Sequence, residues 1–140
     1  MRVVLWTIVA MSLACGGMSG PAQLSVGGTY DTTVALVPGG TCGTPTVANN
    51  PTVVGQNPGS TSLTLTHAGV TYAGTVDMGG NFAVPATAVN GTTQVSITGQ
   101  FNMTGFTATV HVQQTGCAYD VNWVGNKRGS TNTYPEPGYG

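Results

Sequence analysis

Residues 70–101 read VTYAGTVDMGGNFAVPATAVNGTTQVSITGQF, and this stretch decides the fold. Bulky apolar residues alternate with small or polar ones, which is typical of strands that bury one face. Residues 77–81 predict a hairpin turn, because glycine tolerates positive φ and Asp and Asn bond to nearby backbone groups. Asn90 and Gly91 predict a second hairpin. The stretch therefore indicates three antiparallel strands, and Pro85 marks an edge or a bulge because it has no N–H to donate.

The same alternation continues on both sides of this stretch. Good helix formers are scarce, with only three Lys or Arg and four Asp or Glu in 140 residues, and no 3.6-residue pattern follows the N-terminal leader. An all-β fold follows, an antiparallel meander of seven to eight strands, with residues 52–55 as the short eighth. The seven main strands are expected at 29–37, 61–67, 70–76, 82–89, 94–101, 106–113 and 117–124.

Two cysteines indicate how the sheet closes. Cys42 lies in an irregular stretch, residues 38–60, and Cys117 begins the last strand, on the apolar face that also carries Tyr119 and Trp123. A disulfide between them would close a loop of about 75 residues and stabilise the fold by roughly 4 to 5 kcal/mol in the chain-entropy model. It would also join the region after the first strand to the last strand. The sequence thus predicts a small up-and-down barrel, with a β-sandwich as the alternative.

The N-terminus carries an apolar leader. Met1 and Arg2 form a short positive region and residues 3–10 form an apolar run, a pattern that predicts a signal peptide over residues 1–14. The apolar run, even counted to Cys15, is shorter than the roughly 20 residues that a transmembrane helix needs. Export to an oxidising compartment agrees with the predicted disulfide.

Residues 11–15, MSLAC, resemble the lipobox of bacterial lipoproteins, in which a peptidase cuts before a cysteine that then carries lipid. The resemblance implies a lipid anchor at Cys15, a membrane as partner and a tether over residues 15–25. Gly16 stands where inner-membrane retention in many Gram-negative lipoproteins calls for aspartate, which implies the outer membrane or cell surface. Residues 12–14 also satisfy an ordinary cleavage site, so a soluble periplasmic or secreted protein is the alternative.

The rest of the chain reads as one domain. The barrel is expected over residues 26–126, and residues 127–140, rich in Gly, Pro and polar side chains, predict a flexible tail. Gly28-Thr29-Tyr30 resembles the Gly-x-Trp that opens the first lipocalin strand, and Arg128 follows the final strand. This resemblance implies a lipocalin-like barrel and, as an alternative function, a carrier of a small apolar ligand.

The barrel interior is expected to be filled, because an eight-stranded barrel is only wide enough for its own side chains. The inward candidates are bulky residues at alternating positions. They are Tyr30, Val34, Leu36, Leu63, Leu65, Val70, Tyr72, Val76, Phe82, Val84, Val95, Ile97, Phe101, Phe106, Val110, Val112, Tyr119, Val121 and Trp123.

Groups for catalysis or metal binding are few. The acids and histidines of the body are Asp31, Asp77, Asp120, His67 and His111. Asp77 belongs to a turn, the other two aspartates are expected at the surface, and the two histidines are expected on opposite faces of the sheet. No metal-ligand spacing, nucleophile motif or phosphate loop accompanies them, so we expect neither an enzyme nor a metal or other cofactor.

The near absence of positive charge argues against nucleic acid binding. Threonines at 64, 66, 71, 75, 107 and 109 share the faces opposite the core. Threonine suits any half-exposed strand, and it also makes an uncharged hydroxyl surface fit for carbohydrate, ice-like water or self-association. The sequence thus predicts a non-catalytic envelope lipoprotein with a structural or interaction domain, whose protein or carbohydrate partner it does not name.

Overall fold

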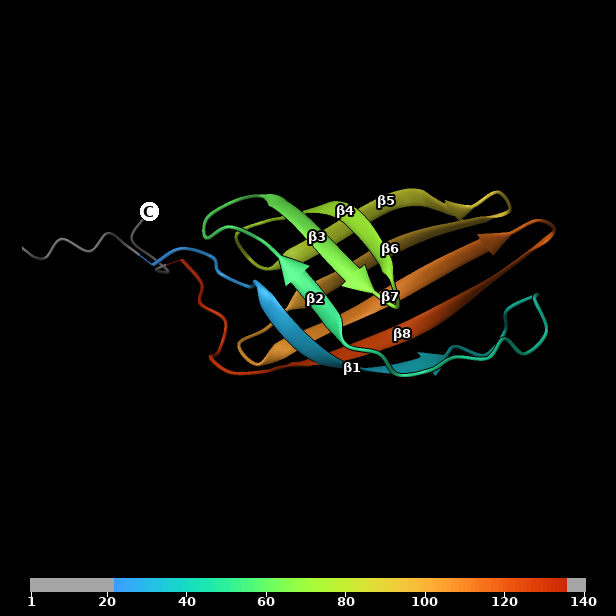
Figure 1. Cartoon of the computed structure of the whole chain (residues 1–140), viewed down its shortest axis with the longest axis horizontal. Coiled ribbons are helices and arrows are strands. Elements are labelled where there is room, and N and C mark those ends of the chain that lie inside the picture. Colours follow the sequence, from blue (N-terminus) through green and yellow to red (C-terminus); the bar gives the residue numbers. More distant parts are fainter. Residues whose placement is uncertain (1–21, 136–140) are drawn as a thin grey trace, which may run out of the picture.

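The computed structural model describes residues 22–135, which form an eight-stranded antiparallel barrel (Figure 1). Each strand pairs with the next along the chain, and β8 closes the barrel by pairing with β1. The strands are β1 (Gly28–Leu36), β2 (Thr52–Gly55), β3 (Ser62–His67), β4 (Val70–Val76), β5 (Asn81–Asn90), β6 (Thr93–Phe101), β7 (Gly105–Gln114) and β8 (Cys117–Lys127). The all-β meander and the barrel are confirmed, including the short strand at 52–55, and the sandwich is not adopted.

The barrel wall is uneven. β7 and β8 pair along their full length, from Gly105 to Gln114, whereas β4 and β5 pair only at Thr75–Ala83 and Val76–Phe82. Figure 1 shows β5 to β8 reaching past the short strands β2 to β4. Long ladders on one side and short ones on the other give the molecule one broad four-stranded wall.

Turn chemistry explains the hairpins. The register of β5 against β6 shifts between Val84 and Thr87, so the bulge predicted at Pro85 is confirmed. Asn90 pairs with Thr93, which confirms a two-residue connection after Asn90. Neither Asn90 nor Gly91 adopts a positive φ. Instead the Asn90 side chain accepts the Thr92 N–H at 2.9 Å and holds the turn.

One apolar core fills the interior. Rings of Tyr30, Phe82, Phe101 and Phe106 contact one another with centroids 4.7 to 6.0 Å apart. Every inward candidate from the sequence lies in this core or packs against it, so that prediction is confirmed. Four buried members were not predicted, and these are Leu24, Val26, Val54 and Ala108.

One end of the barrel is closed by residues 22–27 and 128–135, which we name the plugged end. Leu24 and Val26 have no exposed surface, and Asn132 is as deeply buried. Ser25 and Thr133 exchange two backbone hydrogen bonds of 3.0 and 3.1 Å. These contacts order two short segments without strand periodicity, because they give the backbone groups of both segments hydrogen-bond partners.

The boundaries predicted for the tether and the tail are therefore partly wrong. Residues 22–25 belong to the packed end rather than to the tether, β8 continues to Lys127, and residues 128–135 are part of the plugged end rather than of a flexible tail. The predicted signal peptide 1–14, Cys15, residues 16–21 of the tether and residues 136–140 of the tail lie outside the described residues. Among residues 22–135 there is no helix that could span a lipid bilayer.

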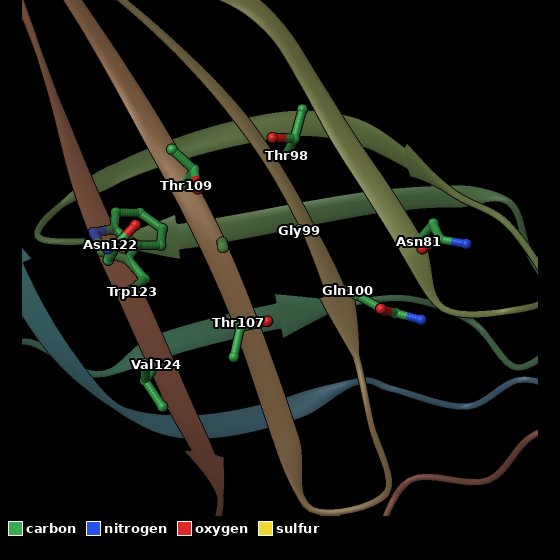
Figure 2. Close-up of a pocket in the computed structure, with 10 residues that line it drawn as sticks. Asn81, Thr98, Gly99, Gln100, Thr107, Thr109, Asn122, Trp123 and Val124 are labelled. Atoms are coloured by element: carbon green, nitrogen blue, oxygen red, sulfur yellow. The ribbon is translucent and has the colours of Figure 1, made fainter. Parts of the chain in front are cut away.

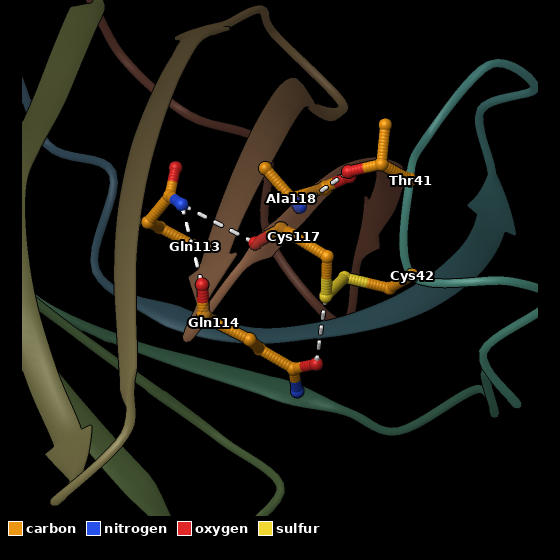
Figure 3. Close-up of a disulfide and its surroundings, with 6 residues drawn as sticks. All are labelled: Thr41, Cys42, Gln113, Gln114, Cys117 and Ala118. Atoms are coloured by element: carbon orange, nitrogen blue, oxygen red, sulfur yellow. Dashed lines mark hydrogen bonds between the residues drawn. A yellow bond between two sulfur atoms is a disulfide. The ribbon is translucent and has the colours of Figure 1, made fainter.

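The opposite end, which we name the clamped end, carries the long connection between β1 and β2. Cys42 and Cys117 form the predicted disulfide, 75 residues apart in sequence (Figure 3). Beside it, the Thr41 N–H donates to the Ala118 carbonyl at 2.8 Å, and the Ala118 N–H donates to the Thr41 hydroxyl at 2.9 Å. The connection thus runs alongside β8 before it returns to β2.

Candidate binding groove

The broad wall aligns polar side chains across three strands. Register places Thr98 of β6, Thr109 of β7 and Asn122 of β8 side by side on the outer face. Two residues further along each strand lie Gln100, Thr107 and Val124, again in register. Because side chains alternate between faces, two parallel outer rows result, separated by about 6.6 Å along the strands.

A hollow of about 500 Å³ lies between and around these rows, and we name it the outer groove (Figure 2). Asn81 of β5 lines it at one side. Its floor follows Gly99, Ala108 and Trp123, whose positions point inward.

Gly99 keeps the floor of the groove shallow and tightly packed. A Cβ at this position would lie 2.4 Å from the Thr107 carbonyl oxygen and 2.5 Å from the Phe82 ring. The wall beneath the groove therefore cannot accept a side chain at Gly99 without moving the core. The groove is a rigid feature of the sheet.

The polar side chains of the groove are not engaged elsewhere. In the described part of the chain, no side-chain hydrogen bond involves Thr98, Gln100, Thr107, Thr109 or Asn122. Their hydroxyl and amide groups face solvent with both donors and acceptors available. Other polar surface residues are satisfied locally: Thr66 and Thr71 bond one another at 2.9 Å, and Asn102 and Asn90 each bond a threonine two residues on.

A third polar row borders the groove. Ser96, His111 and Asp120 lie in register on β6, β7 and β8, and the His111 Nδ1 and Asp120 Oδ1 atoms are 2.6 Å apart. These are the residue types of a hydrolase triad. Among the described residues no hydrogen bond joins Ser96 to His111, and the backbone N–H groups of β7 pair with β6 and β8. The row thus lacks an activated nucleophile and a pair of donors for an oxyanion.

The remaining aspartates have structural partners. Asp31 accepts two bonds from the Arg128 guanidinium, the shorter 2.6 Å, and this contact lowers the pKa of the exposed carboxyl. Asp77 accepts the N–H groups of Gly79 and Asn81, and these bonds, the Asn81 ones foremost, lower its pKa as well. The predicted turn role of Asp77 is confirmed.

His67 is the one histidine that faces the core. Its ring stacks on Trp123 with centroids 4.1 Å apart, and its Nδ1 lies 2.9 Å from the Thr52 hydroxyl. Thr52 lies 2.7 Å from the Thr32 hydroxyl, which donates to the Tyr30 carbonyl. One direction satisfies this chain, with Nδ1–H donating to Thr52 and Thr52 donating to Thr32. Burial lowers the pKa of His67.

The structure separates the two histidines as the sequence predicted, with His67 inside and His111 on the outer face. Within residues 22–135 no three His, Cys, Asp or Glu side chains gather closely enough to hold a metal ion.

The threonines that the sequence placed opposite the core lie on two separate parts of the barrel. Thr107 and Thr109 line the outer groove, whereas Thr64, Thr66, Thr71 and Thr75 lie on β3 and β4. Sequence analysis missed Thr98, Gln100 and Asn122, since only the strand register shows that they align with Thr107 and Thr109. The only sequence signal for Thr98 and Gln100 was the alternation of side chains along this strand, which places both on its outer face.

Comparison with known proteins found no relative. No protein-family model, no curated protein and no solved structure matches this chain.

Proposed function

We propose that this protein is an exported, non-catalytic component of the bacterial cell envelope, held to the outer membrane or cell surface by lipid on Cys15. Its barrel is a rigid module that meets its partner on the outside. The observation that carries this proposal is the contrast between a core filled with aromatic rings and a hollow of about 500 Å³ on the outer wall.

The disulfide supports the exported location. Disulfides persist in oxidising compartments, and Cys42–Cys117 ties a long irregular connection to the last strand. The leader that resembles a lipobox supports the lipid anchor, and Cys15 remains available for it because Cys42 and Cys117 bond each other.

The place where the described part of the chain begins fits an anchored module. Leu24 and Val26 are buried at the plugged end, and the β1–β2 connection that carries the disulfide reaches the other end of the barrel (Figure 1). An anchor upstream of residue 22 would hold the plugged end toward the membrane. The outer groove lies on the side wall, where a membrane at the plugged end would leave it accessible.

The anchor is tested by mass spectrometry of the full chain expressed in a Gram-negative bacterium, with membrane and soluble fractions analysed separately. We expect a mature N-terminus at Cys15 that carries diacylglycerol and an acyl chain, in the membrane fraction. The matched Cys15→Ser variant should lose both the lipid and the membrane association. An unmodified N-terminus beyond residue 15, in the soluble fraction, would overturn the anchor.

A further inference from the structure

We infer that the outer groove binds a neutral polysaccharide chain, which lies across β6, β7 and β8 along the two polar rows. This inference rests on the proposed function, since it names the partner of the interaction surface. It is carried by the charge, hydrogen-bonding capacity and rigidity of the residues that line the groove.

The groove offers no charge to a charged partner. The charged residues among 22–135 are Asp31, Asp77, Asp120, Lys127 and Arg128, and none of them lines the groove. Two of them are already engaged, Asp120 with His111 and Asp77 with the Asn81 side chain. A nucleic acid, an acidic glycan or a basic peptide would find no counter-charge here, so electrostatic complementarity favours a neutral ligand.

The lining groups match a ligand rich in hydroxyls. Thr98, Thr107 and Thr109 each offer one donor and two acceptor sites, and the amides of Gln100 and Asn122 offer separate donors and acceptors. A sugar hydroxyl also both donates and accepts, so each can pair with any of these side chains. Among residues 22–135 none of the five side chains has a hydrogen-bond partner, so a bound polyol would replace water without breaking a bond within this part of the protein.

The spacing of the rows suits a polymer. Polar groups recur about every 4.8 Å from strand to strand and about every 6.6 Å between rows. The sheet fixes these positions, because β6, β7 and β8 pair without interruption beneath them. A preformed array loses little conformational freedom on binding, which favours even a ligand held only by uncharged hydrogen bonds.

A protein partner fits the groove less well. The centres of protein interfaces are enriched in aromatic, methionine and arginine side chains. Trp123 is the one such residue that lines the groove, and only 5% of its surface is exposed. Val124, with 45% exposed, supplies the apolar contact that the carbon face of a sugar ring can use.

Affinity electrophoresis tests the inference. The purified full chain is run in native gels that contain dissolved dextran, a linear β-glucan or a mannan, with alginate as the charged comparison. We expect at least one neutral polymer to retard the protein in proportion to its concentration, and alginate not to do so. Failure of all three neutral polymers, or retardation by alginate alone, would overturn the inference.

Two variants assign the binding to the groove. Thr98→Val/Thr109→Val removes two hydroxyls without changing side-chain shape, and we expect it to weaken retardation tenfold or more. Thr64→Val/Thr75→Val, the same change on β3 and β4, should leave it within twofold. Equal losses in both variants would overturn the groove as the site. Asn122→Asp, which adds a charge at constant volume, serves as a second test if the first variant unfolds, and should also weaken retardation.

A crosslinker placed at position 109 in the envelope of living cells tests the other class of partner. Capture of one defined protein at the groove, together with no retardation by neutral polymers, would overturn the polysaccharide and leave the proposed function standing. Failure of the lipid anchor in mass spectrometry would overturn the proposed function without affecting the electrophoresis.

Discussion

The two ends of the barrel are closed by different means. At the clamped end, one covalent bond between Cys42 and Cys117 ties the β1–β2 connection to β8. At the plugged end, Leu24 and Val26 fill the barrel mouth and Asn132 is buried beside them. A covalent link acts mainly by restricting the unfolded chain, whereas a packed plug acts only through contacts in the folded state. The two ends should therefore respond differently to mutation.

Removal of the disulfide is the largest expected effect. Cys42→Ala/Cys117→Ala should lower the free energy of unfolding by roughly 4 to 5 kcal/mol, because the 75-residue separation leaves a long loop unconstrained in the unfolded chain. Urea unfolding of the purified protein measures this. Amide hydrogen exchange should rise more around Thr41 than at the Asn132 N–H, which bonds Met103 and can exchange faster only through unfolding of the whole barrel or of the plugged end. A loss below about 1 kcal/mol would contradict this account of the clamped end.

Truncation of the plug comes next. Leu24→Ala should cost about 3 kcal/mol, within the range for a fully buried leucine, because the barrel mouth cannot collapse around the missing side chain. The control is Met103→Ala at the same end, where 52% of the side chain is exposed and the change should stay within about 0.5 kcal/mol. Equal effects of the two substitutions, measured by thermal unfolding, would show that residues 22–27 are not part of the folded core.

The two ends also differ in how far the sequence predicts them. Cys42 and Cys117 can be recognised in the sequence because cysteines form disulfides, and the predicted strand order suggests that the two residues meet. Leu24 and Val26 are isolated apolar residues next to Gly and Ser, and Asn132 lies in a polar stretch, so neither segment shows the periodicity that marks a strand. Their order comes from contacts between residues more than 100 positions apart, such as Ser25 with Thr133, and local patterns carry no information about such pairs.

The outer groove shows the same limit. Alternation correctly assigns Thr107 and Thr109 to the outer face. It cannot say that Thr98 and Asn122 lie beside Thr109, because this depends on the lengths of two hairpins and on the register that they set. The inward residues could be predicted because they do not depend on register: the alternation within each strand alone shows which face is apolar.

The hydrogen bonds of the plugged end give a smaller effect. The Tyr30 hydroxyl lies 2.6 Å from the Val26 carbonyl oxygen and 3.0 Å from the Asn132 Oδ1, and Tyr30 has no exposed surface. Tyr30→Phe should cost about 1 to 2 kcal/mol in urea unfolding, since the single hydroxyl hydrogen that the Val26 carbonyl oxygen and the Asn132 Oδ1 share is lost from a buried site. Tyr119→Phe, at a half-buried tyrosine on β8, is the matched control and should change stability by less than about 0.5 kcal/mol. A Tyr30→Phe protein as stable as the original would mean that packing alone closes this end.

The smallest effect concerns His67, which belongs to neither end and joins the short strands to the broad wall through Trp123. Burial lowers the pKa of His67 below its ordinary value of 6.5, so the folded protein resists a proton that the unfolded chain accepts. Above pH 6.5 both states hold a neutral ring and stability does not depend on this group. As the pH falls below 6.5, the free energy of unfolding should decrease until the folded pKa is passed.

The measurement is a series of urea unfolding curves between pH 4.5 and 8 in a His111→Gln background. The chain has two histidines, so this substitution leaves His67 as the only one. Asp31 and Asp77 interfere little above pH 5, because their pKa values are lowered from 3.8 on folding and the stability that they contribute is lost mainly below that pH. His67→Gln should abolish the pH dependence in this range, while Cys42→Ala/Cys117→Ala should keep its slope at a lower stability. Stability that rises as the pH falls would mean that stacking on Trp123 favours the charged ring, and that the cation–aromatic attraction outweighs burial.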